Sequence, residues 1–248
     1  MKAMVLAAGL GTRLRPLTDH RPKALVEIGG RTLLEITLTR LHQFGVTEVI
    51  INVHHFADAI LEFLKSKKNF GMRIEISQEE MLLDTGGGLK KAGWFFLEDS
   101  GRKDEPFLLH NVDIISTVDF AAMLKQHNEN GALSTLAVQH RQTSRYLLFD
   151  SELQLSGRRI VRNKKDEIVR AVEELEPLAF TGIHVISPRL LKLKGEEGPF
   201  SIIDLYLRLA GEGEKIQGFR ADEYYWRDLG KLEQVELANE DYARGLFS

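Results

Sequence analysis

The chain has 248 residues, of which 43% are hydrophobic and 28% are charged, and it contains no cysteine. Its 33 lysines and arginines nearly balance its 36 aspartates and glutamates, so the formal net charge is -3. The missing cysteines exclude a disulfide framework, a cysteine-ligated metal site and thiol catalysis. The near-neutral charge argues against a protein that coats nucleic acid or a membrane surface, so any bound polyanion needs a local cluster of basic residues.

Strands and helices alternate in the first half of the chain. Continuous or alternating apolar runs predict strands at 3–8, 49–53, 72–76, 107–109 and 133–138, and helical periodicity predicts helices at 32–44, 57–65 and 120–127. This order indicates an α/β fold with a doubly wound, mostly parallel sheet.

The second half is richer in strands. We expect short strands at 146–149, 168–172 and 180–186, a turn at Ser156-Gly157, and two final helices at 202–209 and 232–242. No apolar stretch approaches the ~20 residues of a membrane span, and the N-terminus does not lead into a signal-peptide cleavage site. We therefore expect a cytoplasmic protein without nucleic-acid or membrane partners. The sequence does not specify an oligomeric state.

A glycine-rich loop directly follows the first predicted strand. It reads Ala8-Gly9-Leu10-Gly11-Thr12-Arg13-Leu14-Arg15-Pro16, with Pro22-Lys23 shortly after it. Small residues let backbone amides approach an anion closely, and the basic side chains supply the local positive charge. The third glycine of a dinucleotide fingerprint and the Gly-Lys-Ser/Thr of a P-loop are both missing. A bare Gly-x-Gly is usually a plain turn, but the extended string favours phosphate binding.

These residues resemble the signature of the sugar-1-phosphate nucleotidyltransferases. Later matches follow in order across nearly the whole chain, at Asp84-Thr85-Gly86-Gly87-Gly88, Asn111-x-Asp113, Thr181-Gly182 and Asp228-x-Gly230. The closest resemblance is to compact N-acetylmuramate-1-phosphate uridylyltransferases and short mannose-1-phosphate guanylyltransferases. It implies one Rossmann-like domain over 1–248, with a nucleotide-binding half at 1–140, a sugar-binding half at 141–248 and no C-terminal β-helix.

The resemblance also implies a reaction and its central residues. A nucleoside triphosphate, with UTP expected, and a sugar 1-phosphate would give an NDP-sugar and pyrophosphate. Ala8, Gly9, Gly11 and Thr12 would hold the triphosphate, Arg13 would grip the leaving phosphates, and Lys23 would bridge the two substrates. Asp113 and Asp228 match the family's metal ligands, so Mg²⁺ is the expected cofactor.

Further matches imply the base and sugar contacts. Gln78, Thr85 and Gly86 would bind the nucleotide, although Glu79 or Glu80 beside Gln78 could instead accept from guanine. The sugar contacts would be Asn111, Gly157, Thr181 and Gly182.

Relatives usually carry glycine where this chain has Val112, so a close substrate approach is in question here. His54 and His55 lack zinc-site spacing and are expected to be structural or peripheral to the site. The expected role is NDP-sugar biosynthesis in cell-wall recycling. Alternatives are a mannose- or heptose-1-phosphate guanylyltransferase, a phosphocholine cytidylyltransferase, and a catalytically silent sugar-nucleotide sensor.

Overall fold

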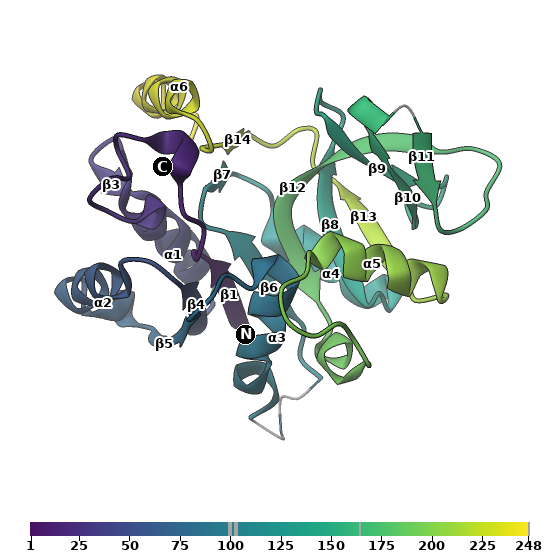
Figure 1. Cartoon of the computed structure of the whole chain (residues 1–248), viewed down its shortest axis with the longest axis horizontal. Coiled ribbons are helices and arrows are strands. Elements are labelled where there is room, and N and C mark those ends of the chain that lie inside the picture. The colour runs from purple at the N-terminus through teal and green to yellow at the C-terminus, as the bar shows by residue number, and fades with distance from the viewer. Residues whose placement is uncertain (99–100, 102–103, 164, 248) are drawn as a thin grey trace. The chain divides into compact units, whose positions relative to one another are not determined.

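The computed structural model describes residues 1–98, 101, 104–163 and 165–247. The chain forms two compact units, each built from several segments (Figure 1). Unit 1 consists of Met1–Leu83, Leu109–Val118 and Tyr224–Ser248, and unit 2 consists of Asp84–Leu108 and Asp119–Glu223. Strand β6 (Phe107–Asn111) begins in unit 2 and ends in unit 1.

Unit 1 contains the expected parallel sheet. Strand β4 (Glu48–Val53) lies between β1 (Lys2–Leu6) and β5 (Arg73–Gln78) and pairs with both in parallel. Almost every residue of β1 and β4 is buried, which explains their continuous apolar runs. The helices are α1 (Leu33–Gln43), α2 (Ala57–Ser66) and α6 (Leu232–Ala243).

Local signals in the sequence set the helix ends in unit 1. The Thr32 hydroxyl caps α1 by accepting from the backbone N–H of Glu35 at 3.1 Å. After the helix, Gly45 adopts a φ of 95°, which favours glycine. Two short antiparallel pairs complete the unit, β2 (Glu27–Ile28) with β3 (Arg31–Thr32) and β7 (Ile114–Ser116) with β14 (Trp226–Asp228).

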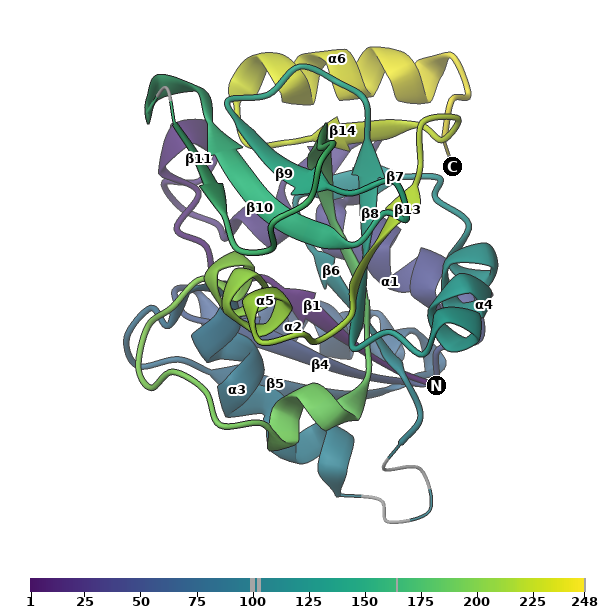
Figure 2. The same ribbon diagram turned by 90° about the vertical axis from the view of Figure 1, so that its right-hand side faces the viewer.

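Unit 2 is built mainly from antiparallel strands. Neighbouring strands pair antiparallel in the order β11 (Lys165–Ile168), β10 (Leu155–Ile160), β9 (Arg145–Phe149), β12 (Glu176–Ile186) and β8 (Ser134–Gln139). Strand β13 (Ile216–Arg220) pairs with β8 in parallel. Its helices are α3 (Asp84–Leu97), α4 (Phe120–Asn130) and α5 (Ile202–Gly211), and α5 packs on β10 (Figure 2). The expected α/β class with a β-rich second half is confirmed.

Two local expectations were wrong. The strand expected at 168–172 ends at Ile168, because the backbone amides of Val169 and Arg170 turn to the Ser156 carbonyl, at 2.9 and 3.2 Å. The turn expected at Ser156-Gly157 lies inside β10. A Cβ on Gly157 would lie 2.4 Å from the Glu167 carbonyl oxygen, so this glycine permits close strand contact. Within the described ranges, no helix is both long and apolar enough to cross a membrane.

Candidate active site

The carboxyl ends of the parallel strands in unit 1 lie level with one another. Leu6 pairs with Asn52, which in turn pairs with Ser77, so the segments after β1, β4 and β5 leave the sheet together. The end of β6 joins them, because the backbone N–H of Val112 donates to the Leu6 carbonyl at 3.1 Å. Ligands of open α/β sheets bind at such an edge.

The glycine loop is exposed but has a fixed conformation. Gly11 has a φ of 63°, and its carbonyl accepts from the Thr18 hydroxyl at 2.9 Å and from the Leu14 amide at 2.8 Å. A Cβ on Gly11 would lie 3.0 Å from Thr18 Cγ2, so the position is both conformationally and sterically suited to glycine. Gly9 faces open space, and Ala8 is buried at the start of the loop. Gly9 can therefore admit a ligand close to its backbone.

Lys23 and Asp113 form an ion pair in unit 1. Lys23 is only 8% exposed, which is rare for a lysine without a charged partner. It follows Pro22 at the start of a short 3₁₀ helix, and Asp113 lies two residues after the end of β6. Two of the expected site residues therefore lie beside each other.

Asp228 is the second carboxylate at this position. Asp228 on β14 pairs with Ile114 on β7, the residue that follows Asp113 in the sequence. The Leu229 amide donates to the Asp113 carbonyl at 2.8 Å. The Oδ1 atom of Asp228 is buried and has no hydrogen-bond partner among the described residues. Burial raises the pKa of Asp228, and the negative charge of Asp113 raises it further, while Lys23, the Gly230 backbone amide and Arg13 oppose the shift. The net effect is a raised pKa.

Arg13 reaches the same place from the glycine loop. A Cβ on Gly230 would lie 2.9 Å from both Arg13 Nη2 and Asp228 Oδ1, so a side chain at position 230 would collide with both groups. We refer to Arg13, Lys23, Asp113 and Asp228 as the charged cluster. All four belong to unit 1 although they come from distant parts of the sequence.

The charged cluster fits a divalent cation such as Mg²⁺. Magnesium favours one or two carboxylates together with phosphate oxygens and water, and two carboxylates meet here. The unpartnered Oδ1 of Asp228 and the raised pKa of this residue are both features that a cation would relieve. Among the described residues, no group of three or more potential ligands from His, Cys, Asp and Glu is found.

Asp228 is held in place by a network that the sequence analysis missed. Arg227 donates to the Asp241 carboxylate on α6 at 2.5 and 2.8 Å and to Gln234 at 2.9 Å, and the Tyr225 hydroxyl donates to Asp241 at 2.7 Å. Burial alone would raise the pKa of Asp241, but Tyr225 and Arg227 lower it overall. The network anchors β14 to α6. No local pattern links these residues, so the sequence offered no signal for it.

Val112 does not strain the backbone at the end of β6. It is 3% exposed and is not among the residues with positive φ in the described chain. Val112 therefore packs as an ordinary core residue, and the backbone does not require glycine here. Its neighbour Asn111 has a buried Oδ1 without a hydrogen-bond partner in the described part of the chain, which is suited to a ligand donor. His110 is buried, and burial followed by the charge of Arg40 lowers its pKa to about 4.

Gln78 and the acidic residues after it occupy different environments. Gln78 is the exposed last residue of β5. Glu79 is only 2% exposed, and its two carboxylate oxygens accept from Asn52 and from the Leu83 amide. Glu79 is thus committed to intramolecular hydrogen bonds, whereas Glu80 is exposed. The alternative that an acidic residue here accepts from guanine stays a prediction. His54 is structural as expected, since its Nδ1 lies 2.8 Å from the Glu79 carbonyl oxygen.

The expected nucleotide residues Thr85 and Gly86 lie in unit 2, at the start of α3. The Thr85 hydroxyl accepts from the Ile202 amide at 3.0 Å, which caps α5 rather than α3. The Gly86 amide donates to the Phe200 carbonyl at 2.9 Å, and a Cβ here would lie 2.2 Å from the Phe200 ring. Both residues thus have structural roles within unit 2, and nucleotide contact remains a prediction.

The expected sugar residues of unit 2 also contribute to the sheet. The buried Thr181 hydroxyl donates to the Ala137 carbonyl at 2.8 Å. Gly182 has a φ of 85° within the irregular register of β12 and β8. A sugar-binding role for Thr181, Gly182 and Gly157 stays a prediction.

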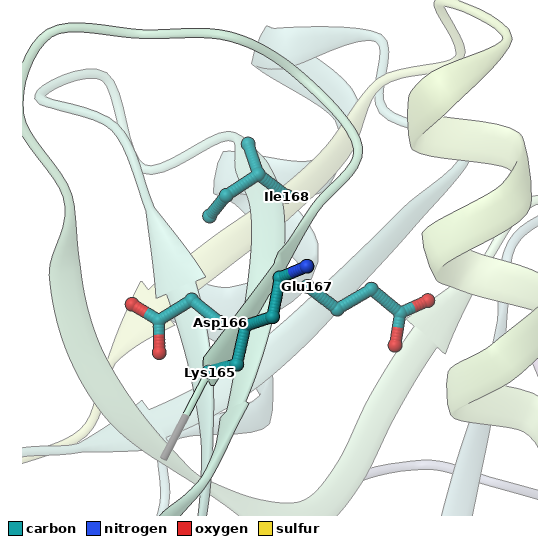
Figure 3. Close-up of a pocket in the computed structure, with 4 residues that line it drawn as sticks. All are labelled: Lys165, Asp166, Glu167 and Ile168. Carbon is teal, nitrogen blue, oxygen red and sulfur yellow. The ribbon is translucent and has the colours of Figure 1, made fainter. Parts of the chain in front are cut away.

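Two hollows of unit 2 lie apart from these residues. One is open and is lined by Lys165, Asp166, Glu167 and Ile168 of β11, with the two carboxylates pointing to opposite sides (Figure 3). Both carboxylates have partners, because Asp166 pairs with Arg159 and Glu167 with Arg158. The other, a cavity of about 260 Å³, has a mainly apolar lining from α3 and the segment 190–205. Neither contains a cluster of groups suited to catalysis.

Known proteins share both the sequence and the fold. The chain is 37% identical to N-acetylmuramate alpha-1-phosphate uridylyltransferase from Caulobacter vibrioides, over 96% of this chain and 95% of that protein. It is 31% identical to probable mannose-1-phosphate guanylyltransferase 1 from Oryza sativa subsp. japonica, over 93% of this chain but 62% of that protein. The structure of a UDP-glucose pyrophosphorylase complexed with UDP-glucose superposes with a TM-score of 0.72 at 18% identity, covering 98% of each chain.

The last of these comparisons supports the fold alone, a mixed, mostly parallel central sheet with helices. A family model described as nucleotidyl transferase matches residues 2–245. The match includes the glycine loop and the whole charged cluster. The chain therefore belongs to the nucleotidyl transferase family.

Proposed function

We propose that this enzyme is a sugar-1-phosphate nucleotidyltransferase that transfers UMP from UTP to a sugar 1-phosphate with the help of Mg²⁺, releasing pyrophosphate. The observation that carries the proposal is the charged cluster beside the exposed glycine loop. Lys23 and Asp113 are paired, and Asp228 has an unpartnered oxygen next to them in the described structure. Two cations and two carboxylates at one point suit a reaction between two polyanions.

The chemistry requires positioning and charge neutralisation. A phosphate monoester is largely dianionic at neutral pH because its second pKa is about 6, so its oxygen can attack the α-phosphorus without a general base. The P–O bond to pyrophosphate breaks as the new P–O bond forms. A bound Mg²⁺, held by Asp113 and Asp228, would neutralise phosphate charge.

The protein's own cations have separate tasks. Arg13 would hold the leaving β- and γ-phosphates with its planar guanidinium. Lys23, a compact charge fixed by Asp113, would contact both the nucleotide and the sugar phosphate. The backbone at Gly9, Gly11 and Thr12 would bind the triphosphate beside Ala8.

The nucleobase and sugar contacts extend from this centre. Gln78, Thr85 and Gly86 would receive the base and ribose, and Asn111, Gly157, Thr181 and Gly182 the sugar. The chain would thus use 1–140 mainly for the nucleotide and 141–248 mainly for the sugar. Among the possible substrates we favour UTP and the 1-phosphate of an N-acetylated acid sugar. The reason is that the Caulobacter vibrioides relative is named as an N-acetylmuramate alpha-1-phosphate uridylyltransferase and matches over almost its full length. Such a product serves NDP-sugar biosynthesis for the cell wall.

Guanylyl transfer to mannose 1-phosphate is the second candidate. It is favoured by the 31% identity to the Oryza sativa protein, although this chain spans only 62% of that relative. The two candidates share one chemistry and differ in base and sugar.

A substrate panel tests the proposal. Pyrophosphate release is measured with four nucleoside triphosphates against N-acetylmuramate, mannose and glucose 1-phosphates, with Mg²⁺ and with EDTA. We expect turnover with UTP and the muramate derivative, and none with EDTA. Turnover with GTP and mannose 1-phosphate would select the second candidate. Nucleotide binding without turnover on the whole panel would instead indicate a silent sensor.

An Asp113→Asn variant tests the metal role. We expect its dependence on Mg²⁺ concentration to shift to higher values, because one ligand charge is lost. Unchanged kinetics would contradict this role.

A further inference from the structure

A chain of buried hydrogen bonds crosses unit 1 from the glycine loop to the segment after β5. Asn52 Oδ1 accepts from the Ala7 amide at 2.7 Å, and Asn52 Nδ2 donates to Glu79 Oε1 at 2.7 Å. Glu79 Oε2 then accepts from the Leu83 amide at 3.0 Å. Asn52 is 3% exposed and Glu79 is 2% exposed. The network therefore lies out of solvent along its central part.

The pattern of donors and acceptors determines which residue types fit. Position 52 must accept on one side and donate on the other, which a carboxamide does. Position 79 must accept with both oxygens, which only an ionised carboxylate does. Burying a carboxylate is unfavourable without strong hydrogen bonds, so a glutamate at this position indicates a need for acceptors on both sides.

The backbone of Glu79 is also held. Its amide donates to the Val53 carbonyl at 2.7 Å, and its carbonyl oxygen lies 2.8 Å from His54 Nδ1. Glu79 is thus fixed at four atoms, all through the end of β4 or the segment that leads to α3. Every polar atom of Glu79 therefore has a partner within unit 1.

We propose that Asn52 and Glu79 are positioning residues for the nucleotide. This inference rests on the proposed function. Ala7 is the residue after β1 and immediately precedes the triphosphate loop, whereas Leu83 ends the segment that starts at Gln78. One buried network thus sets the backbone of the phosphate-binding loop and of the base-binding segment together. In the proposed function other residues bind the sugar 1-phosphate, so we expect the network to affect its binding little.

A reciprocal exchange of side chains tests the network. In Asn52→Asp, two carboxylates face each other. In Glu79→Gln, the NH₂ group of the new carboxamide must face an N–H donor, which is either the Asn52 side chain or the Leu83 amide. In the double variant, the carboxylate introduced at position 52 would accept from the Ala7 amide and from the carboxamide introduced at position 79. The oxygen of that carboxamide would accept from Leu83, so every hydrogen bond is restored and the central one is reversed. The double variant also keeps the net charge and almost the same volume.

The expected results separate positioning from general damage. We expect each single variant to raise the KM for the nucleoside triphosphate about tenfold, which corresponds to about 1.4 kcal/mol. The KM for the sugar 1-phosphate should stay within about twofold, and the double variant should return to within about threefold of wild type. Glu62→Gln, an exposed change on α2 of unit 1, is the matched control and should change neither KM.

Hydrogen exchange by mass spectrometry gives a readout that does not depend on turnover. Peptides covering 7–14 and 79–83 should exchange faster in each single variant and recover in the double variant. If wild-type enzyme turns over no substrate pair, the proposed function fails, and nucleotide Kd replaces KM while the exchange data still test the network.

Three binding or kinetic results would overturn the inference. The first is wild-type nucleotide affinity in both single variants, the second is an equal effect of the single variants on the KM values of both substrates, and the third is a double variant that performs no better than the single variants. If a single variant does not fold, the double still decides, because it must recover both folding and nucleotide affinity. A double variant that does not fold would also overturn the inference.

Discussion

Replacing Asp228 by asparagine should stabilise the protein in the absence of a divalent cation. The wild-type carboxylate is partly buried, has an oxygen without a partner in the described structure, and lies next to Asp113. Leaving a buried polar group unsatisfied costs about 1–3 kcal/mol. The amide has no charge and can donate towards Asp113, but it loses attraction to Arg13 and Lys23, so we expect a net gain of about 1–2 kcal/mol.

This gain is measurable as a thermal shift. For a chain of this size, each 1 kcal/mol moves the Tm by about 2–4 °C, so Asp228→Asn should raise the Tm by about 2–8 °C in EDTA. Glu236→Gln on α6 is the control, since it removes one exposed negative charge within the same unit. Its Tm should stay within about 1 °C of wild type, because surface substitutions change stability little.

The Tm difference should also depend on pH. Because the folded-state pKa of Asp228 is raised above its usual 3.8, the native protein binds more protons than the unfolded chain between those two values. Wild-type stability therefore falls as the pH rises through this window. Asparagine does not titrate, so the advantage of Asp228→Asn should be small at about pH 3.5, below both values, and largest at neutral pH.

Magnesium should reduce the Tm advantage of Asp228→Asn over the wild type. A ligand at ten times its Kd stabilises a protein by about 1.4 kcal/mol, which should appear as a Tm rise of about 3–6 °C in wild type. The rise should be much smaller in Asp228→Asn. Two results would refute the explanation that burial and repulsion from Asp113 make the Asp228 carboxylate destabilising without a cation. One is a lower Tm of Asp228→Asn than of wild type in EDTA, and the other is a Tm difference that does not depend on pH.

Two further predictions concern the loop and α3. Lys23→Ala should lower kcat for pyrophosphate release by about 10²–10³-fold, the usual effect of losing a group that stabilises transition-state charge, whereas Arg15→Ala on the exposed loop should change kcat much less. Intact turnover in Lys23→Ala would contradict the proposed role. Gly86→Ala should lower the Tm by about 2–12 °C, because its Cβ would lie 2.2 Å from the Phe200 ring and overpacking costs about 1–3 kcal/mol. Gly93→Ala in the same helix, with its nearest contact at 3.6 Å, should be neutral or stabilising, and equal calorimetric shifts in the two variants would disprove the packing explanation.

Much of the fold could be predicted from the sequence because hydrophobic periodicity and helix capping depend on neighbouring residues. The strand that became β4 and the helix that became α1 have boundaries within one residue of those expected, since burial and the Thr32 cap depend on neighbouring residues. Strand β10 escaped prediction because Ser156 and Gly157 have turn propensity. There the close approach of the Glu167 carbonyl, a contact between strands, outweighed the local preference.

The site shows the same division. By itself, the sequence determined the glycine loop, the basic residues around it and the aspartates that match a family pattern, because these signals lie in short contiguous motifs. Only the tertiary structure decided that Glu79 is a buried acceptor for Asn52 and Leu83 and that Arg227 anchors β14 through Asp241. It also decided that Asp228 retains an oxygen beside Asp113 that no described residue partners. Hydrogen-bond partners and burial depend on residues that are distant in the chain, and the folded arrangement alone brings these residues together.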